Sequence, residues 1–186
     1  MELKKQITQA VNAVQHGGVI AYPSESVFGL GCDPDDPDAV QRILDLKQRP
    51  VEKGLILVAS SFRQIENYLK PLEHEIQQRV FATWPGPHTW LWPVKDNVSR
   101  LLCGQHTTLA VRVSAYPVVR SLCDALGKAM VSTSANPADF PPARNVTEVR
   151  HYFNEKLDYI IDAEAGKSTQ PTEIRDAMTN KVIRSA

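Results

Sequence analysis

The chain of 186 residues is 42% hydrophobic and 23% charged, and its 21 Lys and Arg residues are balanced by 21 Asp and Glu residues. This length suits one domain with a sizeable core, and the zero net charge gives no overall attraction to nucleic acid or to an anionic membrane. The three cysteines form no Cys-x-x-Cys pair, which argues against a disulfide framework or a thiolate zinc site and favours a reducing, cytoplasmic environment. No apolar run approaches the ~20 residues of a membrane span, and the first residues lack the apolar core of a signal peptide.

Apolar periodicity, helix caps and turn residues predict an alternation of helices and strands. Gly17-Gly18 ends the first helix, and Asp36 caps the second with Pro37 at its first position. In chain order the predicted elements are helix Leu3–Val14, strand Val19–Tyr22, loop Pro23–Gly31, a helix from Asp36 to before Pro50, strand Leu55–Ala59, helical stretches Phe62–Leu69 and Leu72–Ala82, strands Thr89–Val94 and Leu109–Val113, helix Val118–Leu126, strand Ala129–Val131, a helix from Asn145 to Phe153, and strands Tyr159–Ile161 and Lys181–Arg184. Several connections also permit antiparallel pairing, so we predict one mixed α/β domain over residues 1–186.

A dense set of hydroxyls follows the strand at Ala129–Val131, where Ser132, Thr133 and Ser134 precede Asn136. Three consecutive hydroxyls are costly to bury without partners. The stretch is therefore either a strand end that caps its own turn or a wall of a polar pocket. Spacing alone leaves both interpretations open.

Two cations, Lys47 and Arg49, end the second predicted helix, and Lys53 follows closely. A solvated helix end explains them, because the helix dipole favours cations at its C-terminus. They also suit a triphosphate, which lysine meets as a point charge and arginine binds with a two-pronged fork. Neither a Walker phosphate loop nor a G-x-G-x-x-G fingerprint is present, so a nucleotide site must combine side chains from several segments.

Arg112 lies inside an otherwise apolar strand, Leu109–Val113. Because arginine is almost never fully buried unpaired, it either faces solvent or pairs with an anion, for which a substrate carboxylate is a natural candidate. The five histidines show no ligand spacing, so no metal site is predicted, and the absence of a Gly-x-Ser-x-Gly elbow argues against a serine hydrolase.

Five stretches taken together resemble the YrdC-like threonylcarbamoyl-AMP synthase family (also called TsaC) along nearly the whole chain, in its bacterial single-domain form. They are YPSESVFGLG at 22–31, LKQRP at 46–50, WPGP at 84–87, AVRV at 110–113 and STSAN at 132–136. The resemblance implies the YrdC-like (DHBP synthase-like) fold, a twisted mixed sheet flanked by helices with a concave, basic cleft.

The resemblance also implies the conversion of L-threonine, bicarbonate and ATP to L-threonylcarbamoyladenylate and pyrophosphate. Other proteins would then transfer the threonylcarbamoyl group to an adenosine beside the tRNA anticodon. Mg²⁺ is expected to accompany ATP. Because the sequence shows no cluster of carboxylates that could coordinate it, the ion is expected to be bound by the phosphates.

The resemblance carries the family's site onto named residues. The implied catalytic tetrad is Lys47, Arg49, Ser134 and Asn136. The implied threonine-binding residues are Ser24, Arg112, Ser132 and Thr172. The implied ATP-binding residues are Lys47, Arg49, Lys53, Ser134, Asn136 and Arg184. After Asn136 the usual Ser-Gly is replaced by Pro137-Ala138-Asp139, which puts the shape of this loop in doubt.

The principal alternative is an RNA-binding module, a ribosome maturation factor that uses the basic face on double-stranded RNA or tRNA. The zero net charge and the lack of an RNA-recognition motif argue against RNA binding as the main role. A threonine or nucleotide sensor, which would bind without turnover, is a third possibility.

Overall fold

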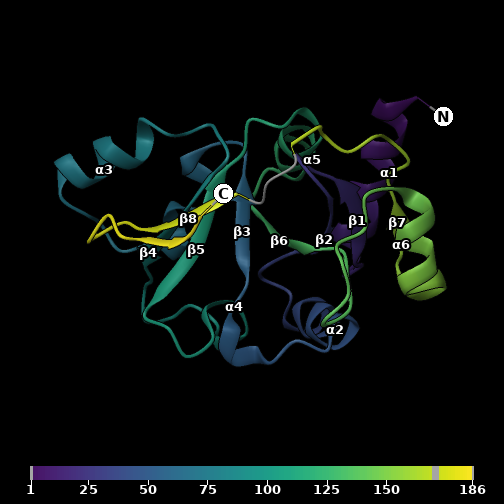
Figure 1. The fold of residues 1–186 in the computed structure, drawn as a ribbon, viewed down its shortest axis with the longest axis horizontal. Coiled ribbons are helices and arrows are strands. Elements are labelled where there is room, and N and C mark those ends of the chain that lie inside the picture. Colours follow the sequence, from purple (N-terminus) through teal and green to yellow (C-terminus); the bar gives the residue numbers. More distant parts are fainter. Residues whose placement is uncertain (1, 169–171, 186) are drawn as a thin grey trace.

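One mixed sheet of nine strands runs through residues 2–168 and 172–185, the part of the chain that the computed structural model describes (Figure 1). Its order is β7-β1-β2-β6-β3-β5-β4-β8-β9, and both parallel and antiparallel pairs occur. The strands are β1 Ile20–Pro23, β2 Phe28–Gly31, β3 Ile56–Ala59, β4 His88–Pro93, β5 Thr108–Val113, β6 Met130–Ser134, β7 Tyr159–Ile160, β8 Glu173–Asp176 and β9 Val182–Arg184. The predicted mixed α/β fold with a twisted sheet is confirmed.

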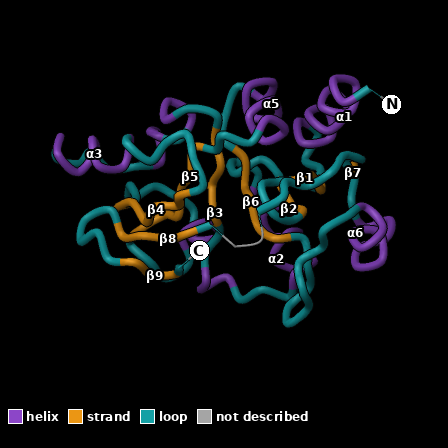
Figure 2. Tube along the Cα trace, turned by 45° about the horizontal axis from the view of Figure 1, so that its top comes forward, coloured by secondary structure: helices purple, strands orange, loops and turns teal. Residues whose placement is uncertain are grey.

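Helices flank this sheet on both faces (Figures 1 and 2). The α-helices are α1 Leu3–Gln15, α2 Pro37–Lys47, α3 His74–Phe81, α4 Arg100–Cys103, α5 Pro117–Leu126 and α6 Val146–Phe153. Short 3₁₀ helices are η1 Val51–Lys53, η2 Phe62–Gln64, η3 Glu66–Tyr68 and η4 Asn154–Lys156. No helix in the described ranges is both long and apolar enough to cross a membrane.

Strand alternation divides the core into two clusters. Val58 and Met130 face α1 and α5, whereas their strand neighbours Leu57 and Val131 pack in the cluster that contains α2. The polar residues that follow Met130 at period two, Ser132 and Ser134, therefore continue on the α1/α5 side of the sheet. Residues paired across neighbouring strands point to the same face of a sheet. Ile56 of β3 pairs with both Ser132 and Ala110, so side chains of β3 and β5 also lie on the α1/α5 side.

Capping chemistry sets the helix starts as predicted. The Asp36 carboxylate accepts hydrogen bonds from the backbone N–H groups of Asp38 and Ala39, and Pro37 occupies the first turn. The Asn145 side chain accepts a hydrogen bond from the N–H of Glu148 at the start of α6. Helix α2 ends at Lys47, and this end lies beside the site described below.

Several predictions of elements were wrong or incomplete. The predicted loop over residues 23–31 contains β2, because its glycines serve packing: a Cβ on Gly31 would lie 2.9 Å from the Met130 sulfur. The stretch 62–69 forms η2 and η3, two 3₁₀ turns, and α4 and β8 were not predicted. Strand β6 also extends to Ser134, so the hydroxyls belong to the strand itself.

Candidate functional site

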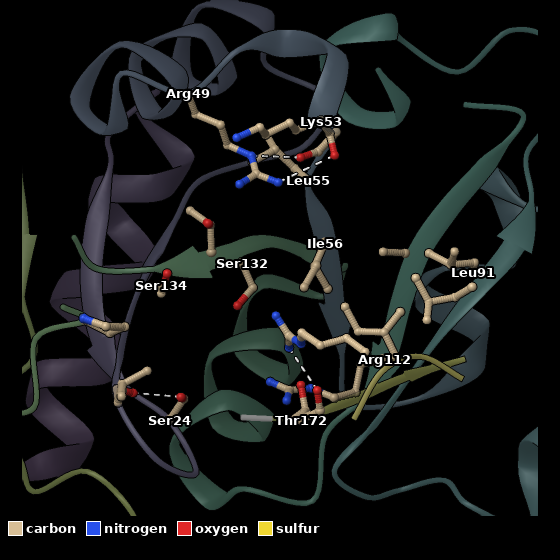
Figure 3. Close-up of a pocket in the computed structure, with 18 of the residues that line it drawn as sticks. Ser24, Arg49, Lys53, Leu55, Ile56, Leu91, Arg112, Ser132, Ser134 and Thr172 are labelled. Atoms are coloured by element: carbon tan, nitrogen blue, oxygen red, sulfur yellow. Dashed lines mark hydrogen bonds between the residues drawn. The ribbon is translucent and has the colours of Figure 1, made fainter. Parts of the chain in front are cut away.

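A cavity of about 670 Å³ opens on the sheet where β3, β5 and β6 lie side by side (Figure 3). Its wall also includes the β1–β2 loop, the segment around η1, residues 141–144, and the C-terminal strands β8 and β9. Of the predicted site residues, those lining it are Ser24, Arg49, Lys53, Arg112, Ser132, Ser134, Thr172 and Arg184. The described lining holds five Lys and Arg residues but one carboxylate, Glu25.

Arg112 is buried in the cavity wall rather than exposed on a solvated face. It is 7% exposed, and its Nη2 lies 3.3 Å from Oε2 of Glu25 as an ion pair. The question that the sequence left open is thus answered, because this arginine has an anionic partner inside the cavity. Its Nε is buried and has no hydrogen-bond partner among the described residues.

Three hydroxyls near Arg112 have fixed positions. Ser24 Oγ donates to the carbonyl of Val27 at 2.7 Å, and the Tyr22 hydroxyl donates to Ser132 Oγ at 2.6 Å. Burial raises the pKa of Tyr22, so its hydroxyl is a neutral donor. Ser132 consequently keeps its own proton available for a ligand. Thr172 Oγ1 lies 3.5 Å from the hydroxyl of Thr89.

Arg49 and Lys53 lie at the opposite end of the cavity from Arg112 and Thr172, with Ser132 and Ser134 between the two ends (Figure 3). Arg49 Nε donates to the carbonyl of Gly54 at 3.0 Å, which fixes its guanidinium. Burial lowers the pKa of Arg49 from its usual range. The arrangement separates two cationic subsites by a row of hydroxyls.

Lys47 and Asn136 lie behind the wall and do not line the cavity. Lys47 is 5% exposed, and its Nζ donates to the carbonyls of Ser134 and Asn136 at 2.5 and 2.8 Å. Burial, followed by the nearby charge of Arg49, lowers the pKa of Lys47 to about 8. The Lys47 ammonium therefore lies against residues 134–136 of the wall, where it donates to two backbone carbonyls and, at 3.3 Å, to the Asn136 side-chain oxygen.

The loop after Asn136 is a hydrogen-bonded turn. The Asn136 side-chain amide donates to the carbonyls of Pro137 and Phe140 at 2.9 and 2.8 Å. The N–H of Ala138 donates to the carbonyl of Lys47 at 2.9 Å, which ties the turn to the end of α2. The replaced Pro-Ala-Asp sequence thus forms an ordered connection.

A family model described as telomere recombination (Sua5/YciO/YrdC) matches residues 12–186. The chain belongs to this family. A curated relative from Photobacterium profundum, named threonylcarbamoyl-AMP synthase, is 51% identical over 180 residues, covering 96% of this chain and 97% of the relative. The resemblance predicted from the five sequence stretches is confirmed.

Two solved members of the Sua5/YciO/YrdC family share the fold. P. abyssi Sua5 complexed with L-threonine is 30% identical and superposes with a TM-score of 0.86 over 93% of this chain. E. coli YciO is 28% identical, with a TM-score of 0.84 over 98% of this chain and 89% of that chain. The chain spans 51% of the Sua5 chain, about half its length.

Within residues 2–168 and 172–185, no group of three or more His, Cys, Asp and Glu residues could hold a metal ion. Mg²⁺ prefers oxygen ligands in octahedral geometry, and the one carboxylate in the described lining, Glu25, is paired with Arg112.

Among the polar residues of the cavity lining that sequence reasoning missed are Glu25, His106 and Arg144. Glu25 could have been found, because it stands between two serines within the stretch that carried the family resemblance. His106 and Arg144 lie outside helices and strands, so no periodic pattern points to the cavity.

Proposed function

We propose that this protein is a threonylcarbamoyl-AMP synthase, which converts L-threonine, bicarbonate and ATP to L-threonylcarbamoyladenylate, pyrophosphate and water. The observation that carries the proposal is a shared cavity with Arg112 at one end and Arg49 with Lys53 at the other (Figure 3). One end suits an amino-acid carboxylate and the other a polyphosphate, so the two reactants would meet between them. The names of the curated relatives support the same activity.

At the amino-acid end, the Arg112 guanidinium receives the threonine carboxylate. The hydroxyls of Ser24, Ser132 and Thr172 orient the rest of the molecule, because each can exchange hydrogen bonds with the threonine side chain. The hydrogen bond from Tyr22 holds Ser132 in one orientation, which reduces the entropy lost on binding.

At the nucleotide end, Arg49 binds phosphate oxygens with its fork and Lys53 adds a point charge. Arg184 Nη2 donates to the carbonyl of Thr172 at 2.8 Å, so Arg184 lies towards the amino-acid end and would contact the nucleotide from that side. Mg²⁺ enters as part of the ATP substrate, held by the phosphates.

Catalysis in this proposal is mainly electrostatic. The threonine amine loses its ammonium proton to water or to a substrate oxygen, then attacks bicarbonate with loss of water. The resulting carbamate oxygen attacks the α-phosphorus as pyrophosphate leaves. Arg49 and the buried charge of Lys47 stabilise the developing phosphate charge, and Ser134 donates to an oxygen of the reacting group. Lys47 and Asn136 also fix the backbone that carries Ser134.

The product is an activated acyl-phosphate anhydride, and tRNA threonylcarbamoyl-transfer proteins would use it to modify an adenosine. We place this reaction in the cytoplasm, in agreement with the three buried, unpaired cysteines. Residues 1–186 act as one domain in this proposal.

The test is pyrophosphate release from ATP, with threonine and bicarbonate each omitted in turn. Release that requires both co-substrates is expected, together with a product that carries the threonylcarbamoyl group on AMP. Equal release without threonine or without bicarbonate would refute the assigned reaction.

A further inference from the structure

Glu25 provides a negative charge inside an otherwise cationic cavity. It lies in the β1–β2 loop, where its Oε1 accepts a hydrogen bond from Ser114 Oγ at 2.7 Å. The other oxygen, Oε2, lies 3.3 Å from Arg112 Nη2 but makes no hydrogen bond within the described ranges. Arg112 Nε is likewise buried without a partner among the described residues. The pair is in contact, and each member retains unused hydrogen-bonding capacity.

The backbone around Glu25 is firmly held. The N–H groups of Gly166 and Ser168 donate to the carbonyls of Ser24 and Glu25 at 2.8 and 3.1 Å. A Cβ on Gly166 would lie 2.3 Å from the Glu25 carbonyl oxygen, so this close approach requires glycine. The carboxylate therefore has a defined place, although an unsatisfied buried oxygen costs about 1–3 kcal/mol. Such groups in native structures call for a functional explanation.

We propose that Glu25 receives the α-amino group of the threonine whose carboxylate Arg112 binds. The ammonium nitrogen and the carboxylate carbon of an α-amino acid are about 2.5 Å apart, as bond lengths and angles require. An amino acid can thus lie antiparallel to the Arg112–Glu25 pair, with each charge against its opposite. Glu25 makes the site specific for a zwitterion over a simple hydroxy acid. This inference rests on the proposed function.

The decisive variant is Glu25→Gln, which keeps the size of the side chain and an acceptor oxygen for Ser114 but removes the charge. We expect its dissociation constant for threonine to rise at least about tenfold, because hydrogen bonds to charged groups are the stronger class. The dissociation constant for ATP should change less than about twofold, since Glu25 is at the other end of the cavity. Glu75→Gln, at an exposed position of α3, is the matched control and should leave both constants unchanged.

A ligand without the amino group separates recognition from mere support of Arg112. In 2,3-dihydroxybutanoate a hydroxyl replaces the amine of threonine. Wild-type protein should bind it at least about tenfold more weakly than threonine, and Glu25→Gln should bind the two ligands about equally. Glu25→Asp keeps the charge on a shorter side chain. Its preference for threonine over 2,3-dihydroxybutanoate should lie between those of wild type and Glu25→Gln, which provides a test if the Gln variant does not fold.

Three outcomes would contradict the inference. An equal loss for both ligands in Glu25→Gln would show that Glu25 only positions Arg112. An unchanged threonine affinity would show that it contacts no amino group. Wild-type protein that releases pyrophosphate without threonine would overturn the proposed function and this inference together, a result distinct from the other two.

Discussion

At the scale of single residues, Lys47 is the most unusual group in the site. Three oxygens surround its Nζ, from Ser134, Asn136 and the Asn136 side chain, and none of them is a carboxylate. Burial therefore lowers its pKa from 10.5 to about 8. Because the folded-state pKa is the lower one, the cost of burying the charge is fully present below about pH 8 and disappears as the pH rises to about 10.5.

This titration predicts a pH dependence of ATP use. Lys47 loses its charge above about pH 8, so kcat/KM for ATP should fall there when threonine and bicarbonate are saturating. Lys47→Arg retains a charge at every accessible pH, and its remaining activity should lack this decline. Pyrophosphate release measured from pH 7 to 10 in both proteins checks the prediction. The same decline in the arginine variant would assign it to another group.

A second prediction concerns the hydroxyl of Tyr22, which is buried and donates to Ser132 at 2.6 Å. Tyr22→Phe should lower the free energy of unfolding by about 0.5–1.5 kcal/mol, the net worth of a typical hydrogen bond. It should also raise KM for threonine severalfold, because Ser132 is then free to rotate. Tyr159→Phe is the control: its hydroxyl bonds the Gln9 side chain on the surface. Equal effects of the two variants on KM would contradict the role of Ser132.

At the scale of elements, two glycines let η1 and α4 pack back to back. Gly54 and Gly104 have φ angles of +62° and +63°, and a Cβ on Gly104 would lie 2.3 Å from the carbonyl oxygen of Glu52. The N–H of Leu55 donates to the carbonyl of Leu102 at 2.8 Å across the same contact. This junction fixes the Gly54 carbonyl, which in turn holds Arg49 at the nucleotide end.

Gly104→Ala should therefore affect both stability and the site. The backbone clash adds to a left-handed strain of about 1–2 kcal/mol, so we expect a loss of at least about 2 kcal/mol in urea unfolding. ATP affinity should fall while threonine affinity is retained. Gly127→Ala is a close control, since its φ is +70° but nothing lies within 4 Å of its Cβ. Gly127→Ala should lose only the stability that the left-handed strain costs. A similar loss of ATP affinity in both variants would contradict the link between Gly104 and the position of Arg49.

The elements also show what sequence reasoning can reach. Capped, periodic helices such as α2 and α6 were predicted because local hydrogen bonds from Asp36 and Asn145 define their starts. Strand β2 was missed because its glycines resemble a turn, although they allow close contacts with Tyr22 of the paired strand β1 and with the distant Met130. Short strand β8 depends on pairing with β4, which no local pattern encodes.

In the candidate site, too, some features could be predicted from the sequence and others depend on the folded structure. Arg112 was predicted to need an anion because a charge inside an apolar strand is expensive to leave unpaired. Its partner Glu25 comes from a loop 87 positions earlier, and that pairing follows only from the folded sheet. Likewise, the hydrogen bonds of Lys47 to the backbone of β6 could not be read from its position at a helix end.

At the scale of the whole molecule, the sheet order gathers residues from positions 24 to 184 around the β6–β3 centre. The formal net charge is zero, yet the described cavity lining carries five Lys and Arg residues against Glu25. Positive charge is thus concentrated in a concave site of about 670 Å³, which suits small anionic substrates more than an extended phosphate backbone.

This distribution predicts a weak salt dependence. A protein that contacts six to ten nucleic-acid phosphates loses roughly 10³–10⁵-fold in affinity between 50 and 200 mM salt. The proposed reaction uses a few cations inside a cavity, where screening is weaker, so threonine-dependent pyrophosphate release should fall less than about fivefold over that range. Parallel filter binding of tRNA on the same preparation provides the comparison. Tight tRNA binding with a steep salt slope, and no threonine-dependent release, would instead favour an RNA-binding protein.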